Sequence, residues 1–141
     1  MGQPETAGAR SERDFYPEPI ELSGLSRGVM NRRRLDADIE AVVILRGEEL
    51  SIIRDLCPHM GGPLSEGEFR AEEGELECPW HGYCYKAEDG SFLRNPNDAI
   101  FEKLKGCWQS YKPEKMPKYR LQLFSYEIRD GKAYVRRPGA A

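Results

Sequence analysis

The apolar positions of the chain come in short runs separated by Gly, Asp and Asn, a pattern typical of β-strands and tight turns. Ala41–Leu45 is a continuous apolar run, which predicts a buried strand. Gly47 then marks a turn, and Leu50–Arg54 carries the next apolar run. The two runs are therefore predicted to pair as a hairpin.

Two Asp-Gly pairs predict two further hairpins, because this dipeptide favours the tight turns that join antiparallel strands. The strands expected around Asp89-Gly90 are Tyr83–Lys86 and Ser91–Leu93, and those expected around Asp130-Gly131 are Tyr119–Ile128 and Lys132–Arg136. Glu75–Cys78 is a further short strand candidate.

The sequence contains one helix candidate, which starts at Asn95 or Pro96 and stops at Gly106. Ile100 and Leu104 would share one face of it. The fold class expected from these patterns is mainly β, an antiparallel domain with one short helix.

Composition narrows the class of protein. The 141 residues suit one domain, which we place at 16–138 behind a polar, disordered tail at 1–15. A net charge of −3 argues against general nucleic-acid binding, which requires a basic excess. No apolar run approaches the ~20 residues that span a bilayer, and the N-terminus lacks the apolar region of a secretory signal. We therefore expect a cytoplasmic protein without membrane contact.

The candidate chemistry lies in two short motifs that contain the chain's only two histidines. Cys57-Pro58-His59 is followed, after eighteen residues, by Cys78-Pro79-Trp80-His81. Pro and Gly punctuate both motifs, which predicts two tight loops that each present one thiolate and one imidazole. Zinc and an iron–sulfur cluster both accept such ligands. The mixed loops favour a two-iron cluster, because each loop can then reach both irons.

The stretch from Cys57 to Tyr85 closely resembles Rieske iron–sulfur domains, on the motifs Cys-Pro-His, Gly-x-Pro-Leu-Ser and Cys-Pro-Trp-His-Gly. A weaker likeness extends from about Ile20 to Arg136. The resemblance implies an antiparallel β-sandwich or barrel with an inserted cluster-binding subdomain at about 55–97. It also implies one [2Fe–2S] cluster, with Cys57 and Cys78 on one iron and His59 and His81 on the other.

High-potential Rieske proteins have two extra cysteines that form a disulfide between the loops. Gly62 and Trp80 occupy the matching positions here, so the resemblance is to soluble ferredoxins of multicomponent oxygenases or to oxygenase Rieske domains. An oxygenase also needs iron held by two further histidines and a carboxylate, which this chain cannot supply. The expected function is a non-enzymatic electron carrier between a flavoprotein reductase and a terminal oxygenase. A noncatalytic subunit of an oxidoreductase complex and a redox-sensing module are the alternatives.

Several neighbouring residues have weaker assignments. Tyr85 matches the tyrosine that donates a hydrogen bond to a cysteine sulfur in high-potential relatives, and strand packing alone is the alternative. Pro96 is either a helix-start proline or part of a loop that covers the cluster. Cys84 and Cys107 are expected to be buried thiols. Six glutamates form either a solvated hairpin or a docking face for a basic partner: Glu66, Glu68, Glu72, Glu73, Glu75 and Glu77.

Overall fold

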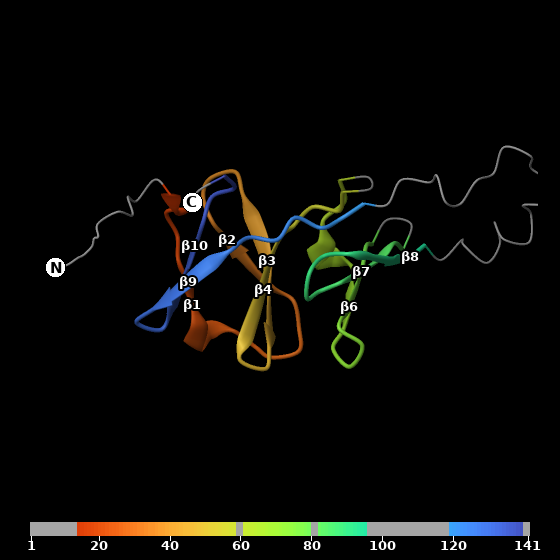
Figure 1. Ribbon diagram of the computed structural model, residues 1–141, viewed down its shortest axis with the longest axis horizontal. Coiled ribbons are helices and arrows are strands. Elements are labelled where there is room, and N and C mark those ends of the chain that lie inside the picture. The colour runs from red at the N-terminus through yellow and green to blue at the C-terminus, as the bar shows by residue number, and fades with distance from the viewer. Residues whose placement is uncertain (1–13, 59–60, 80–81, 96–118, 140–141) are drawn as a thin grey trace, which may run out of the picture. The chain divides into compact units, whose positions relative to one another are not determined.

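The computed structural model describes residues 14–58, 61–79, 82–95 and 119–139 (Figure 1). The chain divides into two compact units. Unit 1 comprises Met1–Asp55 and Leu123–Ala141, and unit 2 is the intervening stretch Leu56–Gln122.

One sheet of unit 1 has the strand order β2-β3-β4, all antiparallel. The strands are β2 (Asn31–Arg34), β3 (Glu40–Arg46) and β4 (Glu49–Arg54). β3 and β4 each bury four consecutive residues, as expected of strands covered on both faces. The predicted hairpin is confirmed, with Val43 opposite Ile52 and a turn at Gly47, whose φ of 61° suits glycine.

The second sheet of unit 1 has the order β1-β10-β9 (Figure 1). Its strands are β1 (Ile20–Glu21), β9 (Tyr126–Arg129) and β10 (Lys132–Val135). A 3₁₀ turn, η2 (Leu22–Gly24), follows β1 directly. The core of the unit combines apolar side chains from both sheets and from the segments next to them: Tyr16, Ile20, Leu35, Ala41, Val43, Leu50, Ile52, Phe124, Ala133 and Val135.

Unit 2 contains a four-stranded antiparallel sheet in the order β5-β6-β7-β8. The strands are β5 (Glu68–Arg70), β6 (Glu75–Glu77), β7 (Cys84–Lys86) and β8 (Phe92–Arg94), preceded by the 3₁₀ turn η3 (Leu64–Glu66). The turn after β7 forms at Asp89-Gly90 as predicted, with the Gly90 amide donating to the Lys86 carbonyl. Beyond the turn, Leu121 is buried and its amide donates to the Gly90 carbonyl.

The antiparallel, mainly β fold predicted from the sequence is confirmed. One predicted strand is shorter than expected: the stretch before β9 is not continuous strand, and there Leu123 forms only an isolated bridge with Ile53. The helix predicted at Asn95–Gly106 lies, apart from Asn95, outside the described residues, as do Cys107 and Pro96. No helix among the described residues is long and apolar enough to cross a membrane.

Candidate metal centre

The first predicted ligand loop leaves β4 and closes on itself through the backbone of Cys57. The Cys57 amide donates to the Gly62 carbonyl at 2.7 Å, and the Gly61 amide donates to the Cys57 carbonyl at 2.7 Å. Gly61 has a φ of 79°, a conformation that side chains disfavour. Cys57 itself is fully buried, so its thiol points into the protein rather than into solvent.

The second predicted ligand loop connects β6 to β7. The cross-strand pair Glu77–Cys84 closes it at its base, and the Cys78 amide donates to the Tyr83 carbonyl at 2.8 Å. Gly82 provides the tight turn with a φ of 68°. Cys78 is buried like Cys57, and its thiol is not in a disulfide. The two cysteines predicted as ligands therefore occupy matching places in two short, hydrogen-bonded loops.

Tyr85 links the two predicted ligand loops. It lies on β7, directly after the second loop, and its hydroxyl contacts a cysteine of the first loop. Its ring is fully buried and its hydroxyl lies 3.7 Å from the Cys57 sulfur. Burial is the main cause that raises the pKa of Tyr85, and the hydrogen bond to Cys57 and the charges of Cys57 and Cys78 raise it further. The phenol therefore stays protonated and can donate a hydrogen bond to a thiolate. Of the two interpretations of Tyr85, the structure supports the sulfur contact and the strand packing together.

These groups fit an iron–sulfur cluster. Thiolates are the ligands that iron–sulfur clusters use, and hydrogen bonds to their sulfur atoms are a usual feature of such sites. Cys57 and Cys78 supply two buried thiols, and Tyr85 supplies the hydrogen bond. The two predicted histidine ligands, His59 and His81, lie outside the described residues.

Residues 20–111 match the family of Rieske [2Fe–2S] domains, and this match covers more than half of the chain. The chain belongs to the Rieske [2Fe–2S] family. A [2Fe–2S] cluster is the cofactor of this domain, as the resemblance implied.

The curated relatives that the chain resembles are subunits or enzymes much longer than the chain itself. It is 34% identical over 86 residues to the vanillate O-demethylase oxygenase subunit of a Pseudomonas species, covering 60% of this chain and 21% of that protein. It is 30% identical over 88 residues to a cholesterol 7-desaturase of Xenopus laevis, covering 55% of this chain and 19% of that protein. The chain thus spans only about a fifth of these relatives.

The fold is also that of a solved ferredoxin. The ferredoxin of carbazole 1,9a-dioxygenase from Nocardioides aromaticivorans superposes with a TM-score of 0.60 at 22% identity, covering 84% of this chain and 96% of that one. At this identity the likeness shows the shared fold of the Rieske domain.

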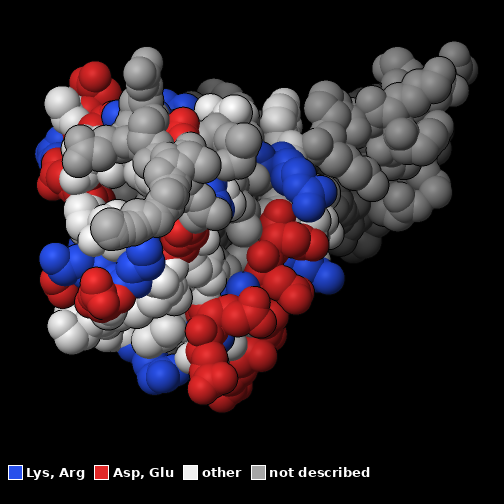
Figure 2. Space-filling view, turned by 60° about the vertical axis from the view of Figure 1, so that its left-hand side comes forward, with Lys and Arg blue, Asp and Glu red and all other residues white. Residues whose placement is uncertain are grey.

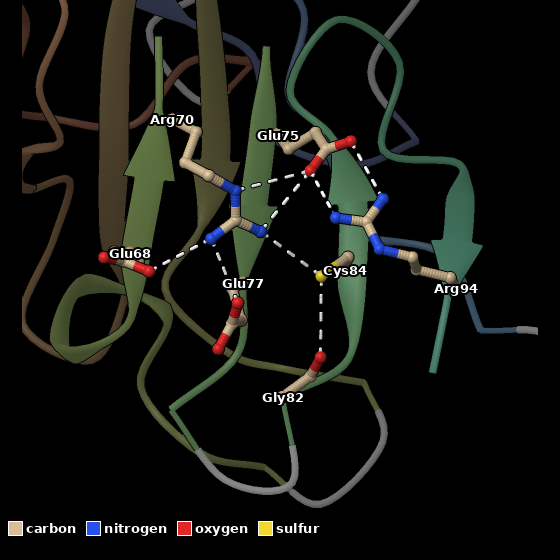
Figure 3. A network of polar contacts seen from close by, with 7 residues as sticks. All are labelled: Glu68, Arg70, Glu75, Glu77, Gly82, Cys84 and Arg94. Atoms are coloured by element: carbon tan, nitrogen blue, oxygen red, sulfur yellow. Dashed lines mark hydrogen bonds and ion pairs between the residues drawn. The ribbon is translucent and has the colours of Figure 1, made fainter. Parts of the chain in front are cut away.

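The face of the unit 2 sheet that lies opposite to Tyr85 carries a network of charged side chains that was not predicted from the sequence (Figure 3). Arg70 on β5 donates to Glu68 and Glu77 at 3.0 Å each, and Arg94 on β8 forms a bidentate pair with Glu75 at 2.9 and 2.7 Å. The alternation of charged and apolar residues along β5 and β6 is the sequence signal for this face. Which residues face each other across the strands depends on the strand register, and the alternation does not determine the register.

The outcome of two weaker assignments can be followed in the same unit. Cys84 is buried, with 3% of its surface exposed, as predicted. The acidic stretch forms the hairpin β5–β6, and four of its glutamates are exposed: Glu66, Glu68, Glu72 and Glu73. Figure 2 shows a band of acidic side chains on the visible face of the molecule.

Proposed function

We propose that Cys57, His59, Cys78 and His81 hold one [2Fe–2S] cluster, with both cysteines on one iron and both histidines on the other. The proposal rests on the Cys-x-His and Cys-x-x-His spacing together with the burial of both cysteines in matching loops. When bound, such a cluster accepts and releases one electron. Two thiolates and two neutral imidazoles leave the oxidised cluster without net charge, which raises its potential relative to a four-cysteine cluster.

The function that these residues support best is a Rieske ferredoxin, a one-electron carrier between a flavoprotein reductase and a terminal oxygenase. The observation that carries this proposal is the shared fold, which covers 96% of the carbazole dioxygenase ferredoxin. A related solved structure holds such a ferredoxin in complex with its oxygenase, again at 22% identity with a TM-score of 0.59. Both histidines of the chain are assigned to the cluster, so the proposal places no oxygenase iron site within these 141 residues.

The second candidate is a Rieske domain that works inside an oxygenase. The 34% identity to the vanillate O-demethylase oxygenase subunit favours it. In that case the cluster would pass electrons to a catalytic site within one complex rather than to a separate partner. The two candidates differ in whether the chain exchanges electrons as a diffusing molecule.

The ligand assignment is tested by electron paramagnetic resonance of the dithionite-reduced protein. We expect the low average g that distinguishes His-ligated clusters from four-cysteine ones, and loss of that signal in Cys78→Ser and His81→Ala. Cys107→Ser is the matched control, because it removes a cysteine outside the ligand pattern. A protein that binds only zinc gives no such signal and refutes the assignment.

The carrier function is tested by turnover with separate partners. The purified protein should be reduced by a flavoprotein reductase and reoxidised by a ferredoxin-dependent oxygenase, with a rate proportional to its concentration. A cluster that shows the Rieske signal but does not exchange electrons with any separate reductase would contradict the carrier and favour the domain of a permanent complex.

A further inference from the structure

Cys84 lies on the face of the unit 2 sheet opposite to Tyr85. The two residues are neighbours on β7, and successive side chains of a strand point to opposite faces. Tyr85 contacts the Cys57 sulfur, whereas the Cys84 thiol lies under the charged network of Arg70 and Arg94 (Figure 3). Cys84 is thus not one of the proposed ligands, and its thiol contacts Arg70 and Gly82.

The Cys84 thiol joins a guanidinium to the second ligand loop. Arg70 Nη2 donates to the Cys84 sulfur at 3.5 Å, and the thiol in turn lies 3.5 Å from the Gly82 carbonyl, to which it donates. Gly82 directly follows His81, so this chain of contacts ends at the peptide next to a proposed ligand. Burial is the main cause that raises the pKa of the Cys84 thiol, so the thiol stays protonated and can donate this hydrogen bond.

Arg70 is itself held from three sides. Glu68 and Glu77 stand opposite each other in the β5–β6 register, where like charges repel, and Arg70 Nη1 donates to both. Arg70 Nε and Nη2 also lie 3.4 Å from the Glu75 carboxylate, which Arg94 holds from the other side.

The arginine therefore has a fixed place from which it reaches both ends of the second loop. Glu77 precedes Cys78, and the Cys84–Gly82 contact follows His81. A single guanidinium and a single buried thiol thus connect the two chain segments that enter and leave the residues 78–81.

We propose that Cys84 and Arg70 are positioning residues that hold the second ligand loop in the geometry the cluster requires. The proposal rests on the assignment of Cys78 and His81 as ligands. Its physical basis is that the contacts of Arg70 and Cys84 join β5, β6 and β7 and so restrain both ends of the loop. The orientation of the ligands is one of the factors that tune a metal centre. Arg70 and Cys84 act through the loop and do not bind the cluster.

The test compares Cys84→Ser with Cys84→Ala. Serine keeps a donor and an acceptor at position 84, whereas alanine has neither, and both lack the sulfur. Arg70→Lys provides a second variant. Lysine keeps the charge but lacks the planar guanidinium that lets Arg70 donate to four acceptors. Lys86→Gln is the control, since Lys86 is an exposed residue of the same strand.

We expect Cys84→Ser and Lys86→Gln to keep the g values and midpoint potential of the wild-type cluster. Cys84→Ala and Arg70→Lys should shift both and release the cluster roughly fivefold faster on incubation with an iron chelator, as the net loss of about one hydrogen bond predicts. A shift of potential and g values is a readout that a lower melting temperature alone does not produce.

Identical spectra, potentials and release rates in Cys84→Ala, Arg70→Lys and wild type would overturn the proposal, even if the variants melt at lower temperature. The same holds if serine shifts the spectrum as much as alanine. Failure of the ligand assignment is distinguishable, because the wild-type protein then lacks the Rieske signal before any substitution is made.

Discussion

Tyr85 is the residue whose side chain directly contacts one of the proposed cluster ligands, Cys57. Its hydroxyl lies 3.7 Å from the Cys57 sulfur inside a fully buried environment. If Cys57 is a cluster ligand, as proposed, its thiolate has no proton, and the phenol is the donor of this hydrogen bond. This hydrogen bond stabilises the more negative, reduced state, because a donor interacts more strongly with a sulfur that carries more charge.

Tyr85→Phe is therefore expected to lower the midpoint potential of the cluster. A difference of about 1 kcal/mol between the two redox states, typical of one hydrogen bond, corresponds to roughly 40 mV for one electron. Protein-film voltammetry measures the change. Tyr134→Phe in unit 1 is the matched control, since it removes the hydroxyl of a half-buried tyrosine on β10 and should leave the potential unchanged. An unchanged potential in Tyr85→Phe would mean that the hydroxyl does not bond to a ligand sulfur.

The residues of the candidate site differ in how far the sequence reveals them. Cys57 and Cys78 are recognisable because the ligand spacing and the turn residues are local in sequence. Tyr85 was indicated only by the resemblance to high-potential Rieske proteins, which have a tyrosine at the matching position four residues after His81. Arg70 could not be assigned, because its partner Cys84 lies fourteen positions away across two strand pairings. Which side chains meet across a sheet depends on the register, and alternation alone does not fix it.

At the scale of elements, the β9–β10 hairpin depends on the conformation of its turn. Asp130 and Gly131 both have positive φ, 52° and 75°, as the tight turns of two-residue hairpins require. A Cβ on Gly131 would meet no atom within 4 Å, so a substitution there acts through the backbone alone.

Gly131→Ala should lower the free energy of unfolding by about 1 kcal/mol, because alanine disfavours positive φ. Chemical denaturation followed by circular dichroism measures it. Gly24→Ala is the matched control: this glycine lacks a positive φ, and its Cβ would meet only the end of the Arg33 side chain at 3.7 Å. We expect Gly24→Ala to be neutral or slightly stabilising. Equal losses in the two variants would refute the conformational explanation.

Gly67 is required for a different reason, which is close approach. A Cβ at this position would overlap the carbonyl oxygen of Glu77 and crowd the Pro79 ring, the residues on either side of Cys78. Gly67→Ala should therefore cost on the order of 2 kcal/mol or more and displace the second ligand loop. The measurement is the iron content of the purified variant, which should fall well below that of Gly131→Ala. A fully loaded Gly67→Ala protein would show that the loop tolerates the displacement.

Glu75 ties three strands of unit 2 together through Arg70 and Arg94. The hydrogen bonds from Arg94 are the main cause that lowers the pKa of Glu75 from its ordinary value of 4.5, and Arg70 lowers it further. A carboxyl with a depressed pKa stabilises the fold above its unfolded value and loses that contribution as the pH falls through the folded value. Stability should therefore decrease progressively on acidification below about 4.5.

Glu75→Gln should lower stability at neutral pH and reduce the acid dependence, because the variant has no proton to take up at this position. Denaturation curves from pH 7 down to pH 3 measure both effects. Glu88→Gln, at an exposed site beyond β7, is the control and should keep the wild-type pH profile. A pH profile of Glu75→Gln that parallels the wild type would contradict the assignment of acid sensitivity to this carboxylate.

The elements themselves were predictable where turn chemistry is explicit. The hairpins at Gly47, Asp89-Gly90 and Asp130-Gly131 form where the sequence places them. The strand predicted to begin at Tyr119 was overestimated. Its apolar residues alternate with polar ones as in a strand, but before β9 it pairs only at single points, such as the bridge between Leu123 and Ile53. The two-residue β1 was not predicted, since so short a strand depends on pairing with β10, which is far away in the sequence.

At the scale of the whole molecule, the distribution of charge matters more than its sum. The net charge is only −3, yet six glutamates fall between residues 66 and 77. Arg70 and Arg94 neutralise the inner carboxylates of this hairpin, Glu75 and Glu77, whereas Glu72 and Glu73 at its tip form no ion pair with any other described residue. The exposed tip is therefore the part of the hairpin that can attract a partner.

If the chain docks as a carrier through the exposed part of the hairpin, its electron transfer should depend on ionic strength. Replacing Glu66, Glu72 and Glu73, the exposed glutamates that do not bind Arg70, by glutamine should slow second-order reduction by a reductase with a basic docking face by roughly tenfold at low salt. The difference should shrink as salt is raised towards 0.5 M, because screening shortens the range of the attraction. Neutralising an equal number of exposed acids in unit 1, Glu18, Asp38 and Glu48, is the control for net charge. Stopped-flow reduction of the cluster separates the two explanations: equal slowing by both sets would assign the effect to overall charge, and only selective slowing by the hairpin set identifies this surface as the docking face.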